Sequence, residues 1–151
     1  SLLYLNKLNY LKEEKEKLND SCDVSKIMLA SVDKFSPSRS DVVFSLDIDK
    51  KNTVFRGSDE MWEAIIDNIL NNFMRYAKSQ IKITLKNNKI ILYNDGPNID
   101  KDVLNNIFTP YEKGVRGVFG LGLSIVKKTL GLLNYDINIE NVKNGVKFII
   151  S

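Results

Sequence analysis

The sequence contains no histidine among its 151 residues. Metal sites built on imidazole, Ser-His-Asp triads and Cys-His pairs are therefore excluded. Any chemistry must use carboxylates, amides, lysine, arginine and backbone groups, which are the groups that proteins use to bind phosphates and nucleotides. Cysteine is nearly absent too. Cys22 is the only one, so an internal disulfide is impossible and a reducing, cytosolic setting is the simplest expectation.

Long apolar runs and a strong charge bias are absent as well. No stretch approaches the roughly 20 apolar residues that a membrane span requires, and the N-terminus lacks the pattern of a secretory signal. The formal net charge is +3, from 22 basic and 19 acidic residues. This excess is too small and too scattered to indicate a nucleic-acid partner, and we expect none. The hydrophobic fraction of 43% suits a single globular domain.

Apolar periodicity and turn residues divide the chain into helices and strands. Helices are predicted over residues 2–18, from the Asp23 cap to the Ser36-Pro37-Ser38 break, and over residues 59–77, 101–107 and 122–133. Strands are predicted over residues 42–48, 53–55, 81–85, 90–93, 136–140 and 146–150, with hairpin turns at Asn87-Asn88 and Asn144-Gly145. The expected fold is an α+β sandwich, in which a mixed sheet of about five strands is covered by helices.

The helix predicted over residues 59–77 carries polar side chains along one edge of its apolar stripe. Asn68 and Asn72 are one turn apart, and Arg75 and Tyr76 continue the same side. An amide oxygen is a suitable neutral ligand for Mg²⁺, and an arginine nearby would suit phosphates. The helix pattern alone favours the simpler alternative, in which the asparagines face water.

An Asn-Asp-Gly-Pro-Asn-Ile segment, residues 94–99, directly follows an apolar strand. At the strand end, Asn94 or Asp95 can accept a hydrogen bond from an exocyclic amine, while Gly96 lets a flat ring approach the backbone. The same residues are excellent material for a plain β-turn, and taken alone they favour that interpretation.

A glycine-rich stretch precedes the helix predicted over residues 122–133. Glycines in front of a helix expose backbone N–H groups to an anion, and the helix dipole adds to the attraction. No Gly-Lys-Ser or Gly-Lys-Thr occurs, which excludes a Walker A loop. A flexible loop explains the glycines about as well as phosphate binding does. The glycines and cations concerned are Lys113, Gly114, Arg116, Gly117, Gly120 and Gly122.

The order of these motifs resembles that of sensor histidine kinases, which belong to the GHKL superfamily together with gyrase B, Hsp90 and MutL. The resemblance covers roughly residues 40–151. In chain order, the N, G1, F and G2 boxes of these kinases resemble the Asn68/Asn72 helix, residues 94–99, residues 107–114 and residues 120–127.

The resemblance implies that the chain binds ATP with Mg²⁺. Asn72 would hold Mg²⁺, and Asn68 and Arg75 would lie at the phosphates. Tyr76 would line the pocket, and the turn at residues 94–96 would receive adenine. The implied catalytic residues are Asn68, Arg75 and Lys113, and the other implied nucleotide contacts are Asn72, Tyr76, Asn94, Asp95, Gly96, Ile99, Phe108, Gly114, Arg116, Gly117, Phe119, Gly120, Leu121, Gly122 and Leu123.

In the hydrolysing members of the superfamily, a glutamate activates water at the position of Asn68. An amide cannot act as that base, so this chain resembles a phosphotransfer module that passes the γ-phosphate of ATP to a histidine on a separate hairpin domain. The alternatives are a GHKL ATPase, a serine kinase of the anti-sigma type, and a degenerate interaction domain that has lost its nucleotide.

The same resemblance implies the partners and the setting. Residues 1–20 resemble the end of a dimerisation-hairpin helix, and residues 21–151 would form the catalytic ATP-binding domain. The parent would be a homodimeric kinase anchored in the membrane, with this domain in the cytoplasm, and a response regulator would receive the phosphate. The fragment alone could be a monomer.

Two positions differ from the common pattern of the family. The usual G1 motif is Asp-x-Gly-x-Gly, so Asn94 stands in the position of the aspartate and Asn98 in that of the second glycine. Asn94 would still accept from the adenine amine, but a neutral acceptor is weaker than a carboxylate. Asp95 would replace it if the turn slips by one residue. Val118 stands where the G2 motif usually begins with glycine.

Overall fold

The computed structural model describes residues 2–11, 17–109 and 122–151. Its helices are α1 (Leu2–Leu11), α2 (Val24–Phe35), α3 (Asp59–Tyr76), α4 (Lys101–Asn105) and α5 (Gly122–Leu132), with short 3-10 turns η1 (Lys17–Asn19) and η2 (Ser36–Ser38). Its strands are β1 (Ser21–Asp23), β2 (Val43–Ile48), β3 (Val54–Arg56), β4 (Gln80–Lys86), β5 (Lys89–Asn94), β6 (Ile137–Val142) and β7 (Gly145–Ile150). None of the described helices has the length and apolar character needed to cross a membrane.

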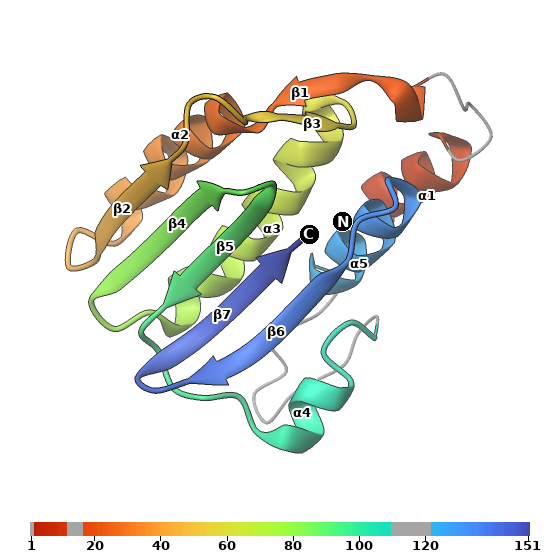
Figure 1. Cartoon of the computed structure of the whole chain (residues 1–151). Helices are drawn as coiled ribbons and strands as arrows, with labels where there is room; N and C mark the ends of the chain where they lie inside the picture. The colour runs from red at the N-terminus through yellow and green to blue at the C-terminus, as the bar shows by residue number, and fades with distance from the viewer. Residues whose placement is uncertain (1, 12–16, 110–121) are drawn as a thin grey trace.

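Five strands form the main sheet, in the order β2-β4-β5-β7-β6 (Figure 1). β2 and β4 are parallel, and the other neighbouring pairs are antiparallel. A segment containing β3 and α3 connects the two parallel strands, because a parallel pair requires a long crossover. β1 and β3 form a separate two-stranded antiparallel sheet. This mixed sheet of five strands confirms the predicted α+β sandwich.

Helices α2, α3 and α5 lie on one face of the main sheet, with α3 between the other two (Figure 1). The apolar stripe of α3, from Met61 to Phe73, is fully buried. It meets the inward-facing residues of the strands, such as Ile83 and Leu92, which alternate with exposed or half-buried ones. Phe73 packs edge-on against Phe148 of β7, with the ring centroids 5.0 Å apart. The core therefore lies between this helix layer and the sheet.

Side-chain caps set the starts of the two long helices beside the sheet. The Asp23 carboxylate accepts a hydrogen bond from the Ser25 N–H at 3.2 Å, which confirms the predicted cap of α2. The Ser58 hydroxyl accepts from the Met61 N–H at 3.2 Å and caps α3 in the same way. Both caps satisfy N–H groups that a helix start would otherwise leave without a partner.

The hairpin turns follow the asparagines. The predicted Asn87-Asn88 turn is confirmed, since both residues have positive φ and join β4 directly to β5. The second turn lies one residue earlier than predicted, at Lys143 and Asn144, because Gly145 already pairs across the hairpin as part of β7. β1 is not predicted by the sequence, because three residues are too few for a period-2 pattern.

Candidate functional site

Asn68, one of the two candidate amides of α3, lies near the start of α5. Asn68 and Asn72 are both half-buried, at the edge of the core as predicted. The Asn68 Nδ2 donates a hydrogen bond to the Ala64 carbonyl oxygen at 2.7 Å. A Cβ atom placed on Gly122 would lie only 3.2 Å from the other amide atom of Asn68, Oδ1. The first residue of α5 and Asn68 of α3 are therefore neighbours in space, although they are far apart in the sequence.

The C-terminal end of α3 touches the turn that follows β5. Arg75 is exposed at this end, and Tyr76 is half-buried. A Cβ atom on Gly96 would lie 2.3 Å from the Tyr76 carbonyl oxygen, which is closer than any real Cβ approaches. Glycine is therefore required here by the contact between the turn and α3. The sequence interpretation, in which glycine admits a flat ring, does not include this reason.

Asn94, the last residue of β5, has a buried side chain at the start of the turn. Only 3% of the residue is exposed, within a core that is otherwise almost entirely apolar. Its Oδ1 accepts a hydrogen bond from the Gly96 N–H at 2.9 Å, which closes the turn locally. Burying an amide is costly unless its polar atoms have partners, and the Gly96 N–H supplies one for the amide oxygen.

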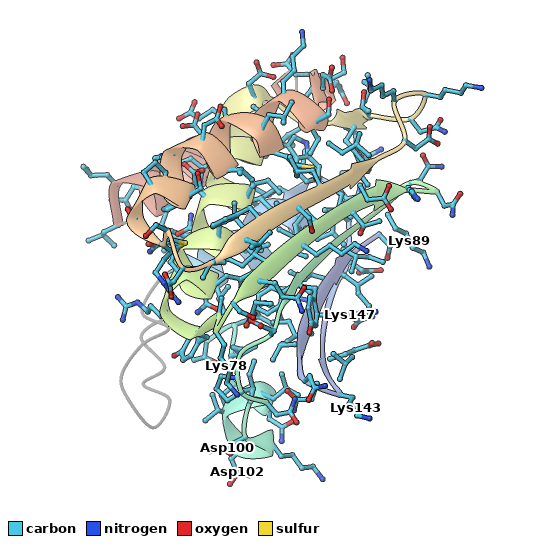
Figure 2. The ribbon with its side chains drawn as sticks, turned by 90° about the vertical axis from the view of Figure 1, so that its left-hand side faces the viewer. Lys78, Lys89, Asp100, Asp102, Lys143 and Lys147 are labelled. Atoms are coloured by element: carbon cyan, nitrogen blue, oxygen red, sulfur yellow. The ribbon has the colours of Figure 1, made fainter. Side chains whose placement is uncertain are left out.

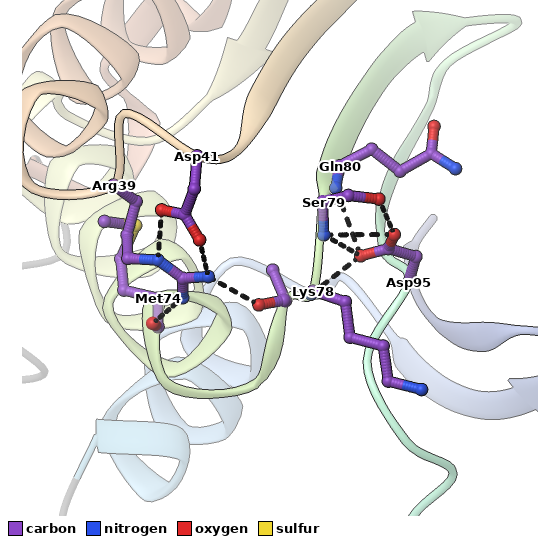
Figure 3. A network of polar contacts seen from close by, with 8 residues as sticks. Arg39, Asp41, Met74, Lys78, Ser79, Gln80 and Asp95 are labelled. Carbon is purple, nitrogen blue, oxygen red and sulfur yellow. Dashed lines mark hydrogen bonds and ion pairs between the residues drawn. The ribbon is translucent and has the colours of Figure 1, made fainter.

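Asp95 has a different set of partners and holds the loop between α3 and β4 (Figure 3). Its carboxylate accepts hydrogen bonds from the backbone N–H groups of Lys78, Ser79 and Gln80, at 2.9 to 3.1 Å, and from the Ser79 hydroxyl. Burial raises the pKa of this carboxyl, but the hydrogen bonds from Ser79, Gln80 and Lys78 outweigh burial and lower the pKa to about 2. Both carboxylate oxygens of Asp95 are thus engaged within the protein.

Arg39 binds the C-terminal end of α3 (Figure 3). Its guanidinium donates to the carbonyl oxygens of Met74 at 2.7 Å and Ala77 at 2.9 Å, which satisfies acceptors at the helix end. Asp41 holds the guanidinium in place through two hydrogen bonds, at 3.0 and 2.9 Å. The sequence offers no signal for this arrangement, because Arg39 precedes Met74 by 35 residues and no local pattern links them.

Ile99 precedes α4 in the sequence, and Phe108 follows it. Ile99 is half-buried against the core, and its backbone N–H donates to the Asn141 Oδ1 at 2.8 Å. Phe108 is also half-buried, and the ammonium group of Lys127, from α5, lies 5.4 Å from the centroid of its ring. Neither Asn141 nor Lys127 is a predicted site residue, because both approach from elements that are distant in the sequence.

The predicted site residues on α3 form one region with the segments at Gly96 and Gly122. The polar residues from Asn68 to Tyr76 follow one side of the helix, with the start of α5 at one end and the turn at Gly96 at the other. Leu123 is 1% exposed and belongs to the hydrophobic core. The predicted contacts that lie outside the described residues are Lys113, Gly114, Arg116, Gly117, Phe119, Gly120 and Leu121.

A metal ion in this region would depend on amide oxygens. Within the part of the chain that the structure describes, no group of three histidine, cysteine, aspartate or glutamate side chains could hold a metal. Asn72 is half-buried on the same side of α3 as Asn68, and its amide oxygen is a hard, neutral donor. Such a donor fits Mg²⁺, which keeps most of its own waters and is also bound by phosphate oxygens.

Comparison with known proteins by sequence gives a consistent answer. The model of the family described as histidine kinase-, DNA gyrase B- and HSP90-like ATPase matches residues 57–151, which is more than half of the chain. The sensor histidine kinase CssS of Bacillus subtilis (strain 168) is 36% identical over 154 residues, covering 99% of this chain and 34% of CssS. The chain therefore spans about a third of the length of this relative.

Solved structures show the same fold. The mycobacterial sensor histidine kinase MprB has a TM-score of 0.78 at 16% identity, over 87% of this chain and 95% of that one. The catalytic domain of the histidine kinase ThkA has a TM-score of 0.77 at 22% identity, over 87% of this chain and 92% of that one. With the fold and the family model in agreement, this chain belongs to the family of histidine kinase-, DNA gyrase B- and HSP90-like ATPase domains.

Proposed function

We propose that this chain is the ATP-binding catalytic domain of a sensor histidine kinase and transfers the γ-phosphate of ATP to a histidine on a separate helical hairpin. The observation that carries the proposal is the approach of Gly122 to the Asn68 amide oxygen, which joins the two segments that would enclose the phosphates. Membership of the ATPase family supports ATP as the nucleotide. The name of CssS supports a sensor histidine kinase as the parent protein.

At the phosphate end, Asn72 would hold Mg²⁺, and Asn68 would lie beside the phosphates. When bound, Mg²⁺ would supply positive charge at the phosphate oxygens. Arg75 is exposed on the same side of α3 and would add a second cation, with Lys113 and Arg116 contributing from beyond the described residues. Phosphoryl transfer asks little covalent chemistry of a protein, so positioning and charge neutralisation are the contributions expected from these side chains.

At the adenine end, Asn94 is a better candidate than Asp95 for the exocyclic amine. The carboxylate of Asp95 is already engaged by the backbone of residues 78–80. The amide oxygen of Asn94 accepts one hydrogen bond from within the turn, and a carbonyl oxygen has a second lone pair. Tyr76 and Ile99, both half-buried, would form apolar walls beside the ring.

The amide at position 68 favours transfer over hydrolysis. Asn68 donates to the carbonyl oxygen of its own helix, and an amide cannot take a proton from water as a general base does. A superfamily member that hydrolyses ATP would need a glutamate at this position. We therefore place the chain with the phosphotransfer enzymes and not with the ATP-driven conformational machines.

The acceptor histidine would come from outside this chain, which has none. α1 packs beside α5, and we propose that residues 1–20 are the end of the hairpin helix and residues 21–151 the catalytic domain. In this view the parent is a homodimer anchored in the membrane. It presents this domain to the cytoplasm and passes its phosphate on to a response regulator.

Replacing Asn72 by alanine tests the phosphate end. We expect transfer from ATP to a supplied hairpin domain of the parent to fall by roughly 100-fold or more, because the protein ligand of the metal is removed. The fold should persist, since Asn72 lies at the edge of the core. The measurement is radioactive phosphate incorporated into the hairpin. Asn71→Ala, at the exposed neighbouring position, is the matched control and should transfer normally. Transfer at the wild-type rate by Asn72→Ala would show that the Asn72 assignment is wrong.

A further inference from the structure

Two asparagines tie the segment after β5 to the hairpin formed by β6 and β7. The Asn98 Nδ2 donates hydrogen bonds to the carbonyl oxygens of Val142 and Gly145, at 3.0 and 2.8 Å. The Asn141 side chain forms two hydrogen bonds with the Ile99 backbone. It accepts from the N–H and donates to the carbonyl oxygen, both at 2.8 Å. Residues 98 and 99 are therefore joined to a single hairpin by side-chain amides.

The partners of each amide dictate its orientation. The Asn98 Nδ2 faces two carbonyl oxygens, so this position requires a hydrogen-bond donor. Neither glycine nor a carboxylate side chain supplies a donor. The Asn141 amide faces one donor and one acceptor on the Ile99 backbone, so it must present one of each. Both positions therefore use the particular chemistry of an asparagine side chain.

The same hairpin supports the buried asparagine of the turn. A Cβ atom on Gly145 would lie 2.3 Å from the Asn94 carbonyl oxygen, so glycine is needed for the backbones to approach this closely. Figure 2 shows Lys143, at the hairpin turn, at the same end of the molecule as Lys78, whereas Lys89 lies at the opposite end. The end of the β6–β7 hairpin thus lies at the end of the molecule where α3 meets the turn after β5.

We propose that Asn98 and Asn141 are positioning residues for adenine, which hold Ile99 and the preceding turn in the binding arrangement before the nucleotide arrives. This inference rests on the proposed function, because it names what prepares the adenine end of that site. A segment that is already fixed loses less conformational entropy on binding, and its affinity for the ligand increases accordingly. Asn98, which replaces the second glycine of the common G1 motif, is then an anchor and not a lost contact.

Asn98→Gly distinguishes an anchor from a weakened site, because the two roles predict opposite changes in the affinity for ADP. If Asn98 marks a weakened site, glycine restores the common motif and ADP binds more tightly. If Asn98 is an anchor, glycine removes two hydrogen bonds and adds backbone freedom, so ADP binds more weakly. Asn141→Ala removes both bonds to Ile99 and should act in the same direction. Both asparagines are exposed, so the fold should tolerate their replacement.

The test is calorimetric titration of the chain with Mg²⁺-ADP and with Mg²⁺-tripolyphosphate, which probes the phosphate end alone. We expect Asn98→Gly and Asn141→Ala to weaken ADP binding by about three- to tenfold and to leave tripolyphosphate binding unchanged. Asn138→Ala, at an exposed position of β6, is the matched control and should bind both probes as the wild type does. In the nucleotide-free chain, hydrogen exchange of the Ile99 amide should be faster in Asn141→Ala.

Three results would overturn the inference. Unchanged or tighter ADP binding by Asn98→Gly, with normal binding by the wild type, would refute it and leave the proposed function intact. Equal weakening of both probes would point to general destabilisation and would refute it too. A wild-type chain that binds neither probe would refute both the inference and the proposed function. Should Asn98→Gly fail to fold, the same two titrations of Asn141→Ala decide the question alone.

Discussion

Three consecutive residues, Asn94 at the end of β5 and the two that follow it, have three different tasks. Asn94 is buried and closes the turn on Gly96. Asp95 binds the loop between α3 and β4, and Gly96 leaves room for the Tyr76 carbonyl oxygen. A slip of one residue would disturb all three arrangements at once, because each depends on the side to which its residue points. We therefore propose the alignment in which Asn94, and not Asp95, takes the place of the G1 aspartate.

Asp95→Ala should lower the free energy of unfolding, and the loss should depend on pH. The pKa of the folded carboxyl, about 2, lies below its ordinary value of 3.8, so the unfolded chain binds more protons between these values. The stabilisation is fully present above about pH 4 and is lost as the pH falls toward about 2. We expect a loss of about 1 to 2 kcal/mol at neutral pH, measured by urea unfolding.

The control for Asp95→Ala is Asp100→Asn, because the carboxylate of Asp100 forms no capping hydrogen bond at the start of α4. Its unfolding free energy should equal that of the wild type at neutral pH. A difference between Asp95→Ala and the wild type that stays constant from neutral pH to about pH 3 would contradict the proposed role of the ionised carboxylate.

At the scale of elements, α5 contains two glycines in opposite surroundings. Gly122 begins the helix, where a Cβ atom would crowd the amide oxygen of Asn68. Gly131 lies near the other end of the helix and is exposed, and a Cβ atom placed there would meet nothing within 4 Å. Replacing glycine by alanine should therefore have different effects at Gly122, beside the candidate site, and at Gly131, away from it.

Gly131→Ala should stabilise the chain by roughly 0.5 to 1 kcal/mol, because alanine restricts the unfolded chain and favours the helix. Gly122→Ala should instead displace the Asn68 amide, which is held by its bond to the Ala64 carbonyl oxygen, and weaken ADP binding by roughly fivefold. Thermal unfolding and ADP titration of both variants measure the two effects. Normal ADP binding by Gly122→Ala would contradict the placement of Asn68 beside the nucleotide.

Elements with strong local signals could be predicted from the sequence, whereas arrangements that depend on distant partners could not. α3 has a long apolar stripe, and the Asn87-Asn88 turn has its own backbone preference. β1 exists because it pairs with β3, which no local pattern of three residues reveals. Asn98 is recognisable as a departure from the family motif, but its acceptors lie 44 and 47 residues away.

At the scale of the whole molecule, the chain combines the fold of the histidine kinase-, DNA gyrase B- and HSP90-like ATPase family with the absence of any histidine. Helices α2, α3 and α5 cover one face of the sheet, and the candidate site extends along α3, from the start of α5 to the turn after β5. Under the proposed function, the acceptor histidine would be presented from outside this chain, which has none.

The isolated chain should neither label itself nor turn over ATP steadily. It has no histidine to accept phosphate, and Asn68 cannot activate water as a base. Incubation with radioactive ATP, followed by measurement of protein-bound label and released phosphate, tests both expectations. Adding the hairpin domain of the parent should produce acid-labile label on the hairpin. Sustained release of phosphate by the chain alone would indicate an ATPase instead.

The most direct test of the central claim is calorimetric titration of the wild-type chain with ADP and a non-hydrolysable ATP analogue, with and without Mg²⁺. We predict dissociation constants on the order of µM to sub-mM, with tighter binding when Mg²⁺ is present. The absence of binding up to several mM, an order-of-magnitude limit for a useful site, would contradict the claim. The chain would then be a scaffold of this family that has lost its nucleotide.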